Sequence, residues 1–215
     1  KPYAEVSGSY GSFNTHKETV RAGSGLLGNH WAFDARLSNI QSDGYRDRAT
    51  SDLKSYFVQG GYYGESTTVK FITFGGKEKT YHAWDGISRE QLKTDRTFNP
   101  NGAIKHGNTI TGFYDDQTDN YRQTHYQLIF NHIFSTTWDM NVALHYTDGF
   151  GYYQEYKNMR TLKEYGLQPF YLPGETEPQK KTDLVRQKLV DSGFGGGIFS
   201  VNYKSEWLNA SLGGG

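Results

Sequence analysis

Six side chains in one long polar interval of the sequence have the chemical types that capture small solutes. They are Tyr81, His82, Trp84, Arg89, Arg96 and Tyr114. Guanidinium groups pair with anionic groups, aromatic faces attract rings and cations, and binding residues concentrate on loops. We therefore predict these six as candidate ligand-binding residues, with packing of the loop against its neighbours as the alternative role.

Two further sets of residues could bind metal, and in each case we favour a plainer role. The run 115–120 (DDQTDN) offers oxygen ligands for Ca²⁺ but lacks the glycine and the final glutamate of an EF-hand loop. His125 and His145 are of a type that ligates haem iron, yet both share the polar face of adjacent predicted strands. A solvated loop and a polar lining explain them, so we predict no metal site and no cofactor.

The sequence shows no constellation expected of an enzyme. It contains no Cys, which excludes disulfides, thiolate metal sites and Cys nucleophiles. It also lacks the GxSxG, HExxH and GxxxxGK[ST] motifs. We predict that the protein is not an enzyme.

Charge and composition narrow the class of protein. Lys plus Arg and Asp plus Glu both total 23, and this neutrality argues against nucleic acid as a partner. The chain has 17 Tyr, 13 Phe and 26 Gly, whereas disordered chains are poor in aromatics. Many aromatic residues and glycines favour an all-β protein.

Alternation with a period of two is the strongest structural signal. In residues 137–147 (TWDMNVALHYT) one parity is wholly apolar and the other nearly wholly polar, which a strand separates and a helix does not. The chain as a whole predicts about nine strands, over 3–12, 17–27, 30–41, 51–63, 67–74, 121–134, 137–147, 186–204 and 207–215. The alternation is less clean in 51–63, 67–74 and 186–204. The parity of the apolar residues switches within 186–204 after Gly195, Gly196 and Gly197, which predicts a β-bulge there.

The connections between these strands alternate in length. Every second link is tight, and the links between those include two long ones, over 75–120 and 148–185. An antiparallel meander with tight turns at one end and long loops at the other is typical of an outer-membrane β-barrel. Aromatic residues at both ends of the apolar run, Trp138 and Tyr146, fit the two interfacial girdles of such a barrel. A soluble β-sandwich is the alternative, although it rarely needs long loops at one end only.

Several local motifs resemble TonB-dependent outer-membrane receptors, at the start of the barrel that follows their plug domain. They are 6–15 (VSGSYGSFNT), 23–27 (GSGLL), 33–38 (FDARLS), 42–45 (SDGY), 74–77 (FGGK), 84–86 (WDG), 96–100 (RTFNP), 145–149 (HYTDG) and 212–215 (LGGG). The resemblance implies a plugged barrel of 22 strands in the outer membrane of a Gram-negative bacterium, of which residues 1–215 would supply about nine. It also implies active uptake of a scarce solute such as an iron–siderophore, haem or cobalamin, with the TonB complex, the solute and membrane lipid as partners.

The ends of the sequence fit this expectation. The chain begins at Lys1 without Met and stops at Gly215 within a predicted strand, so we expect it to be part of a longer protein in which the plug and the later strands lie elsewhere. The alternative function is that of a soluble β-rich module that binds glycans or proteins through its aromatic loops.

Overall fold

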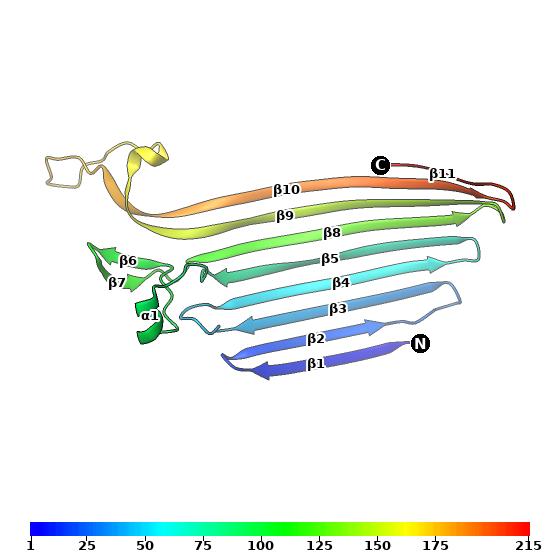
Figure 1. Ribbon diagram of the computed structural model, residues 1–215, viewed down its shortest axis with the longest axis horizontal. Helices are drawn as coiled ribbons and strands as arrows, with labels where there is room; N and C mark the ends of the chain where they lie inside the picture. The colour runs from blue at the N-terminus through cyan, green and yellow to red at the C-terminus, as the bar shows by residue number, and fades with distance from the viewer.

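The computed structural model describes residues 1–215 and consists almost entirely of β-strands. Nine strands form one antiparallel meander sheet (Figure 1). In order across the sheet they are β1 (Tyr3–Gly11), β2 (Thr15–Gly23), β3 (Trp31–Ser42), β4 (Ser51–Tyr63), β5 (Thr67–Tyr81), β8 (Thr118–Ile133), β9 (Trp138–Thr161), β10 (Lys181–Lys204) and β11 (Asn209–Gly214). Between β5 and β8 lie helix α1 (Arg89–Thr94) and a separate ribbon of β6 (Ala103–His106) and β7 (Thr109–Phe113), and a 3₁₀-helix (Leu162–Tyr165) follows β9. Neither helix is long and apolar enough to cross a membrane.

Tight turns and long loops lie at opposite ends of the sheet (Figure 1). At one end are the links 24–30, 64–66, 134–137 and 205–208. At the other are 12–14, 43–50, 82–117 and 162–180, which we call the long-loop end. The predicted meander, its nine strands and its alternation of link lengths are therefore confirmed.

Four strands are longer than the alternation predicts. β5 continues to Tyr81, β8 begins at Thr118, β9 continues to Thr161 and β10 begins at Lys181. The two long loops shrink accordingly to 82–117 and 162–180. The added residues lack alternation, but a ladder joins backbone groups and does not require it.

The predicted β-bulge at Gly195, Gly196 and Gly197 is wrong. Pairing between β9 and β10 is continuous there, and the register shift in this pair lies between Thr182 and Leu184. The glycines instead make room for side chains of β9, because a Cβ at Gly197 would lie 2.6 Å from the Leu144 side chain. The strand keeps its phase, so Phe194 and Ile198 lie on one face and Phe199 on the other.

The register gives the sheet two chemically distinct faces. Directly paired residues of an antiparallel sheet share a face, so Leu144 on β9, Leu128 on β8 and Phe71 on β5 lie side by side. We call this the apolar face. It also carries the residues Ala22, Phe33, Leu37, Val58, Val69, Phe130, Val142, Val201 and Leu212. The opposite, polar face carries residues such as Arg36, Gln59, Gln127 and Asn141, together with some apolar exceptions.

The band of apolar residues runs obliquely across the strands. The paired row that begins at Val20 on β2 passes Leu37 and Tyr56 and reaches Asp148 on β9. On β9 the apolar run lies nearer the tight turns, from Trp138 to Tyr146. The band thus shifts toward the tight-turn end from β2 to β11.

Burial is concentrated at the long-loop end. Only 14 of 215 residues are buried, and in the strands of the sheet away from this end only glycines are among them. The side chains of the apolar face are open, with Leu128 41% and Leu37 63% exposed. The sheet has no hydrophobic core of its own.

Candidate functional site in the long loops

Residues 82–117 form a compact unit at the long-loop end, which we call the loop unit. Asn99 lies at its centre and is fully buried. The Asn99 amide group donates to the backbone carbonyls of Asp47, at 3.0 Å, and His82, at 2.8 Å, and its side-chain oxygen accepts from the Asn101 backbone N–H at 3.1 Å. Buried polar groups need such partners, so Asn99 ties together segments of the chain about 50 residues apart.

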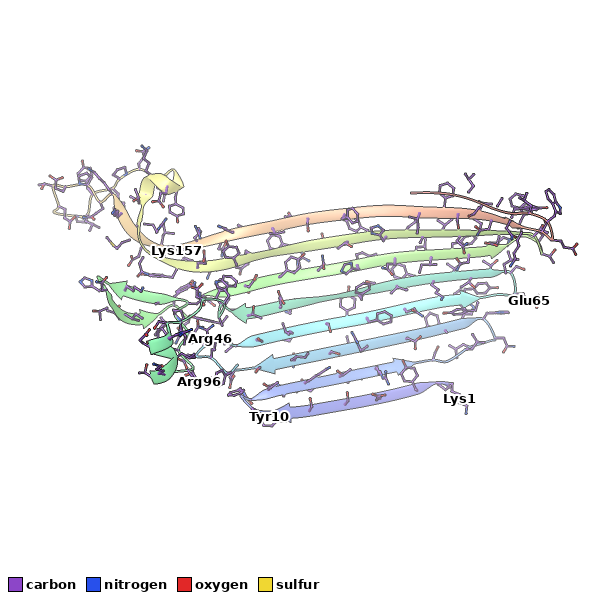
Figure 2. All side chains as sticks on the ribbon, in the orientation of Figure 1. Lys1, Tyr10, Arg46, Glu65, Arg96 and Lys157 are labelled. Carbon is purple, nitrogen blue, oxygen red and sulfur yellow. The ribbon has the colours of Figure 1, made fainter.

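Two arginines of the 43–50 loop hold the loop unit from one side. The Arg46 guanidinium donates to the backbone carbonyls of Asp85, at 2.9 Å, and Phe98, at 3.2 Å. Arg48 lies with its guanidinium carbon 3.5 Å from the ring centroid of Phe113, a close cation–π contact. Figure 2 shows Arg46 and Arg96 at the same end of the sheet, close to α1.

The extended part of β9 holds the loop unit from the other side. The Asn158 side chain accepts from the Lys105 backbone N–H at 2.6 Å and donates to the Ala103 carbonyl at 2.9 Å. The Gln117 side chain accepts from the Tyr156 backbone N–H at 2.7 Å. These bonds explain why β9 continues beyond its apolar run.

Two of the six candidate residues have structural contacts through their hydroxyl groups. Tyr81 ends β5 and is 6% exposed, and its hydroxyl donates to the backbone carbonyls of Asn101 and Tyr114, the latter at 2.9 Å. The Tyr114 hydroxyl accepts from the Gln154 amide at 2.7 Å. Both tyrosines therefore join the loop unit to the sheet.

His82 is 2% exposed, and neither of its ring nitrogens has a hydrogen-bond partner of good geometry. Its ring stacks on Trp84 at 4.0 Å between centroids and meets Tyr153 edge-on at 6.0 Å. Burial lowers the pKa of His82, and the carboxylates of Asp119 and Glu155 oppose this only in part. His82 is thus held neutral beneath an aromatic cover.

The other three candidate residues face solvent. Trp84 is 57% exposed, and the exposed residues Arg89 and Arg96 are the first residue of α1 and a residue just after it. Ser88 caps α1 by accepting from the Gln91 backbone N–H at 3.1 Å. Neither Arg89 nor Arg96 is engaged in an ion pair. An indole face and two free guanidinium groups can meet an anionic or aromatic solute, and ligand contact at all six residues remains a prediction.

The sequence reasoning missed the residues that build the loop unit, above all Arg46, Arg48 and Asn99. Asn99 lies in the segment 96–100 (RTFNP), whose family resemblance is the one sequence signal that points to it. Arg46 and Arg48 follow the segment 42–45 (SDGY). The contacts of both arginines cross about 50 residues of chain, which no local pattern reveals.

The expectation that the sequence has no GxGxxG motif is wrong. Residues 23–28 (GSGLLG) match the GxGxxG spacing of dinucleotide-binding turns. In the structure they end β2 and enter the turn to β3, with no helix after them. The strand–turn–helix context that gives the motif its meaning is missing, so it marks a turn.

Comparison with solved structures identifies a relative in fold. The ferric-catecholate import receptor Fiu from E. coli K12 matches in its closed crystal form with a TM-score of 0.62 and 12% sequence identity, over 94% of this chain and 29% of the receptor chain. Its open form matches with a TM-score of 0.60 and 13% identity, over 94% and 31% respectively. This chain therefore spans about a third of the length of that receptor. Neither a protein-family model nor a curated protein sequence matches. At this identity the likeness concerns the fold: the nine-stranded antiparallel meander has the architecture of a segment of the receptor's barrel.

Proposed function

We propose that the chain is part of the barrel of a TonB-coupled outer-membrane receptor that takes up a scarce solute. The candidate solutes are an iron–siderophore, haem, cobalamin or a similar compound. The proposal places the protein in the outer membrane of a Gram-negative bacterium, with the long-loop end outside the cell. It rests above all on the oblique apolar band on one open face of the sheet.

The band has the shape that a bilayer requires. Strands of a membrane barrel tilt by roughly 35–45°, so a level apolar slab crosses the hydrogen-bonded rows obliquely. Aromatic residues border the band on the same face, with Trp31 and Trp138 toward the tight turns and Tyr56 and Tyr146 toward the long loops. Amphipathic rings at both borders suit the two membrane interfaces.

The likeness to Fiu supports the same proposal. In that role the polar face of the sheet would line the barrel and contact a plug, and movement of the plug would be driven by the TonB complex. The loop unit would capture solute, with Trp84, Arg89 and Arg96 as its exposed contacts. Its internal bonds would keep these three in place.

A soluble glycan- or protein-binding module is the competing function. Such a domain would bury its large apolar side chains between two layers. Here the buried apolar residues are Tyr81, Ala103 and Leu162, all at the long-loop end, and the apolar face is open. This distribution favours the membrane proposal.

Cysteine labelling tests the orientation, because the chain has no Cys of its own. Arg96 and Glu65 lie at opposite ends of the sheet (Figure 2). In the natural protein that contains this chain, we expect Arg96→Cys to react with a membrane-impermeant maleimide in intact cells. The matched Glu65→Cys variant should react only after the outer membrane is permeabilised. Equal labelling of both variants in intact cells would contradict the placement.

Uptake is tested separately. Cells that express the protein should accumulate radioactive iron supplied as a ferric catecholate, and accumulation should stop when TonB is deleted. Haem and cobalamin serve as the other test solutes. If none of these compounds enters in a TonB-dependent manner, the proposed transport function fails even where the orientation is correct.

A further inference from the structure

A row of like charges spans three strands of the apolar face, between the apolar band and the long loops. Lys54 on β4 lies directly opposite Lys77 on β5, which in turn lies opposite Arg122 on β8. Like charges directly opposite one another destabilise a sheet. Lys54 is the next residue on this face after Tyr56, so the row begins where the apolar band ends. An anion from outside the chain would reduce the repulsion between these three cations.

The neighbouring carboxylates compensate for this charge only in part. Lys54 meets Asp52 at 3.3 Å, and Arg122 meets Asp148 at 3.9 Å. Lys79, one position farther toward the loops on the same face, meets Asp116 at 2.9 Å. The partners in these pairs are 42–63% exposed, and exposed pairs contribute little.

Lys77 is the unpaired member of the row. No carboxylate oxygen lies within 4.0 Å of its ammonium group, although cations flank it on both sides. On this face of the sheet four cations thus meet three carboxylates, and Lys77 has no partner among them. Glu78, between Lys77 and Lys79, belongs to the opposite face.

A hollow of about 320 Å³ lies over the same row. Three cations, Lys77, Lys79 and Arg122, line it together with two acidic residues, Asp52 and Glu78, and the aromatic residues Phe150 and Tyr152. The Arg122 guanidinium lies 5.8 Å from the centroid of the Phe150 ring. The hollow therefore combines hydrogen-bond donors that fit phosphate oxygens with apolar surface for the body of a larger molecule.

We propose that this cluster of Lys54, Lys77, Lys79 and Arg122 binds the phosphate groups of a membrane-lipid headgroup. The inference rests on the proposed function, because the membrane places this face against the outer leaflet at headgroup level. A lipid is the occupant, rather than a solute in transit, because the cluster lies on the face opposite the polar lining. Clusters of Lys and Arg beside a membrane border recognise anionic lipid headgroups.

The test uses the natural protein that contains this chain, extracted from its membrane in detergent. The test variant is Lys77→Gln with Arg122→Gln. The matched control is Arg36→Gln with Lys70→Gln, which removes the same charge from the polar face of the same sheet. Mass spectrometry counts the phosphorylated lipid that remains bound, and binding of phosphatidic acid in mixed micelles is titrated against that of inorganic phosphate.

We expect the test variant to lose affinity for phosphatidic acid about 25-fold, since each cation near an anionic lipid surface contributes roughly fivefold. The control should bind as the unaltered protein does. Equal binding by test and control variants would overturn the proposal. Inorganic phosphate binding as tightly as phosphatidic acid would overturn the assignment to lipid.

Membrane fractionation of the same cells separates this inference from the proposed function. Protein that reaches the outer membrane but holds no phosphorylated lipid contradicts the lipid site alone. Protein found only in the soluble fraction contradicts both.

Discussion

The sheet and the loop unit are stabilised in opposite ways. In the sheet the strands are joined by backbone ladders, and the apolar side chains have no protein to pack against. The loop unit buries polar side chains: Asn99 is satisfied by bonds within the chain, whereas the His82 ring is held by aromatic contacts without a hydrogen bond. The sheet therefore depends on what surrounds it, whereas the loop unit carries its own core. One chain thus combines a sheet whose apolar face is uncovered with a unit whose buried contacts lie within the chain.

A charge placed on the apolar face should have the largest effect and tests whether the two faces of the sheet have different environments. Leu128→Arg lies mid-band and should cost about 2–4 kcal/mol in a bilayer, because the guanidinium would enter the hydrocarbon region. Gln127→Arg is the adjacent residue on the polar face and should cost far less. Equilibrium unfolding from vesicles measures both free energies. Equal costs would show that the two faces do not differ in environment.

Removing the central amide of the loop unit should disturb that unit and spare the sheet. Asn99→Ala leaves the carbonyls of Asp47 and His82 and the N–H of Asn101 without their partner, at a cost of about 2–3 kcal/mol. Hydrogen exchange should quicken in 82–117 and stay unchanged in β3 and β4. Asn108→Ala, at the exposed turn between β6 and β7, is the control. Uniform exchange changes along the chain would contradict separate stabilisation.

The cation–π contact tests how the 43–50 loop holds the loop unit. Arg48→Lys keeps the charge but loses the planar group over Phe113, and we expect a loss of about 1 kcal/mol. Arg89→Lys, at an exposed position on α1, should have no measurable effect. Proteolysis within 82–117 reports the difference. A loop unit equally resistant in both variants would show that Arg48 is not needed there.

Acid should loosen the loop unit through His82, with little effect at neutral pH. Because its pKa is lowered in the folded state, the unfolded chain binds the proton more readily as pH falls below the ordinary value of 6.5. Stability is therefore complete above that pH and declines as pH falls toward the lowered pKa. His82→Phe keeps an aromatic ring against Trp84 and should abolish this decline in proteolysis of 82–117. His106→Gln should leave it intact, and a decline that persists in His82→Phe would assign it to another group.

The two regions also differ in how far the sequence predicts them. All nine strands of the sheet were predicted, most clearly where residues such as Val142, Leu144 and Tyr146 alternate with polar ones, and less clearly in β4, β5 and β10. Alternation gave wrong strand ends and a wrong β-bulge where other contacts determine which residues are present. The far half of β9 binds the loop unit through side chains such as Asn158, and Gly197 makes room for Leu144 rather than forming a bulge.

For the six candidate residues, the sequence gives the residue types but not which side chains are buried. The aromatic residues and arginines of 81–114 have the types expected of ligand-binding residues. Tyr81 and His82 are nevertheless buried, whereas Trp84 is exposed, because tertiary contacts decide which of these side chains meets solvent. The arginines that hold the loop unit, Arg46 and Arg48, belong to a different loop. Their partners lie on residues such as Phe98 and Phe113, and only the fold brings these segments together.

The proposal that the apolar face of the sheet contacts lipid is tested most directly on β8. Each residue from 127 to 131 is replaced singly by a spin-labelled cysteine in the membrane-embedded protein, and its accessibility to oxygen, which enriches in lipid, is compared with that to a water-soluble nickel chelate. We predict high oxygen accessibility at 128 and 130 and lower values at 127, 129 and 131. An absence of alternation, or the reverse parity, would contradict a lipid-facing sheet.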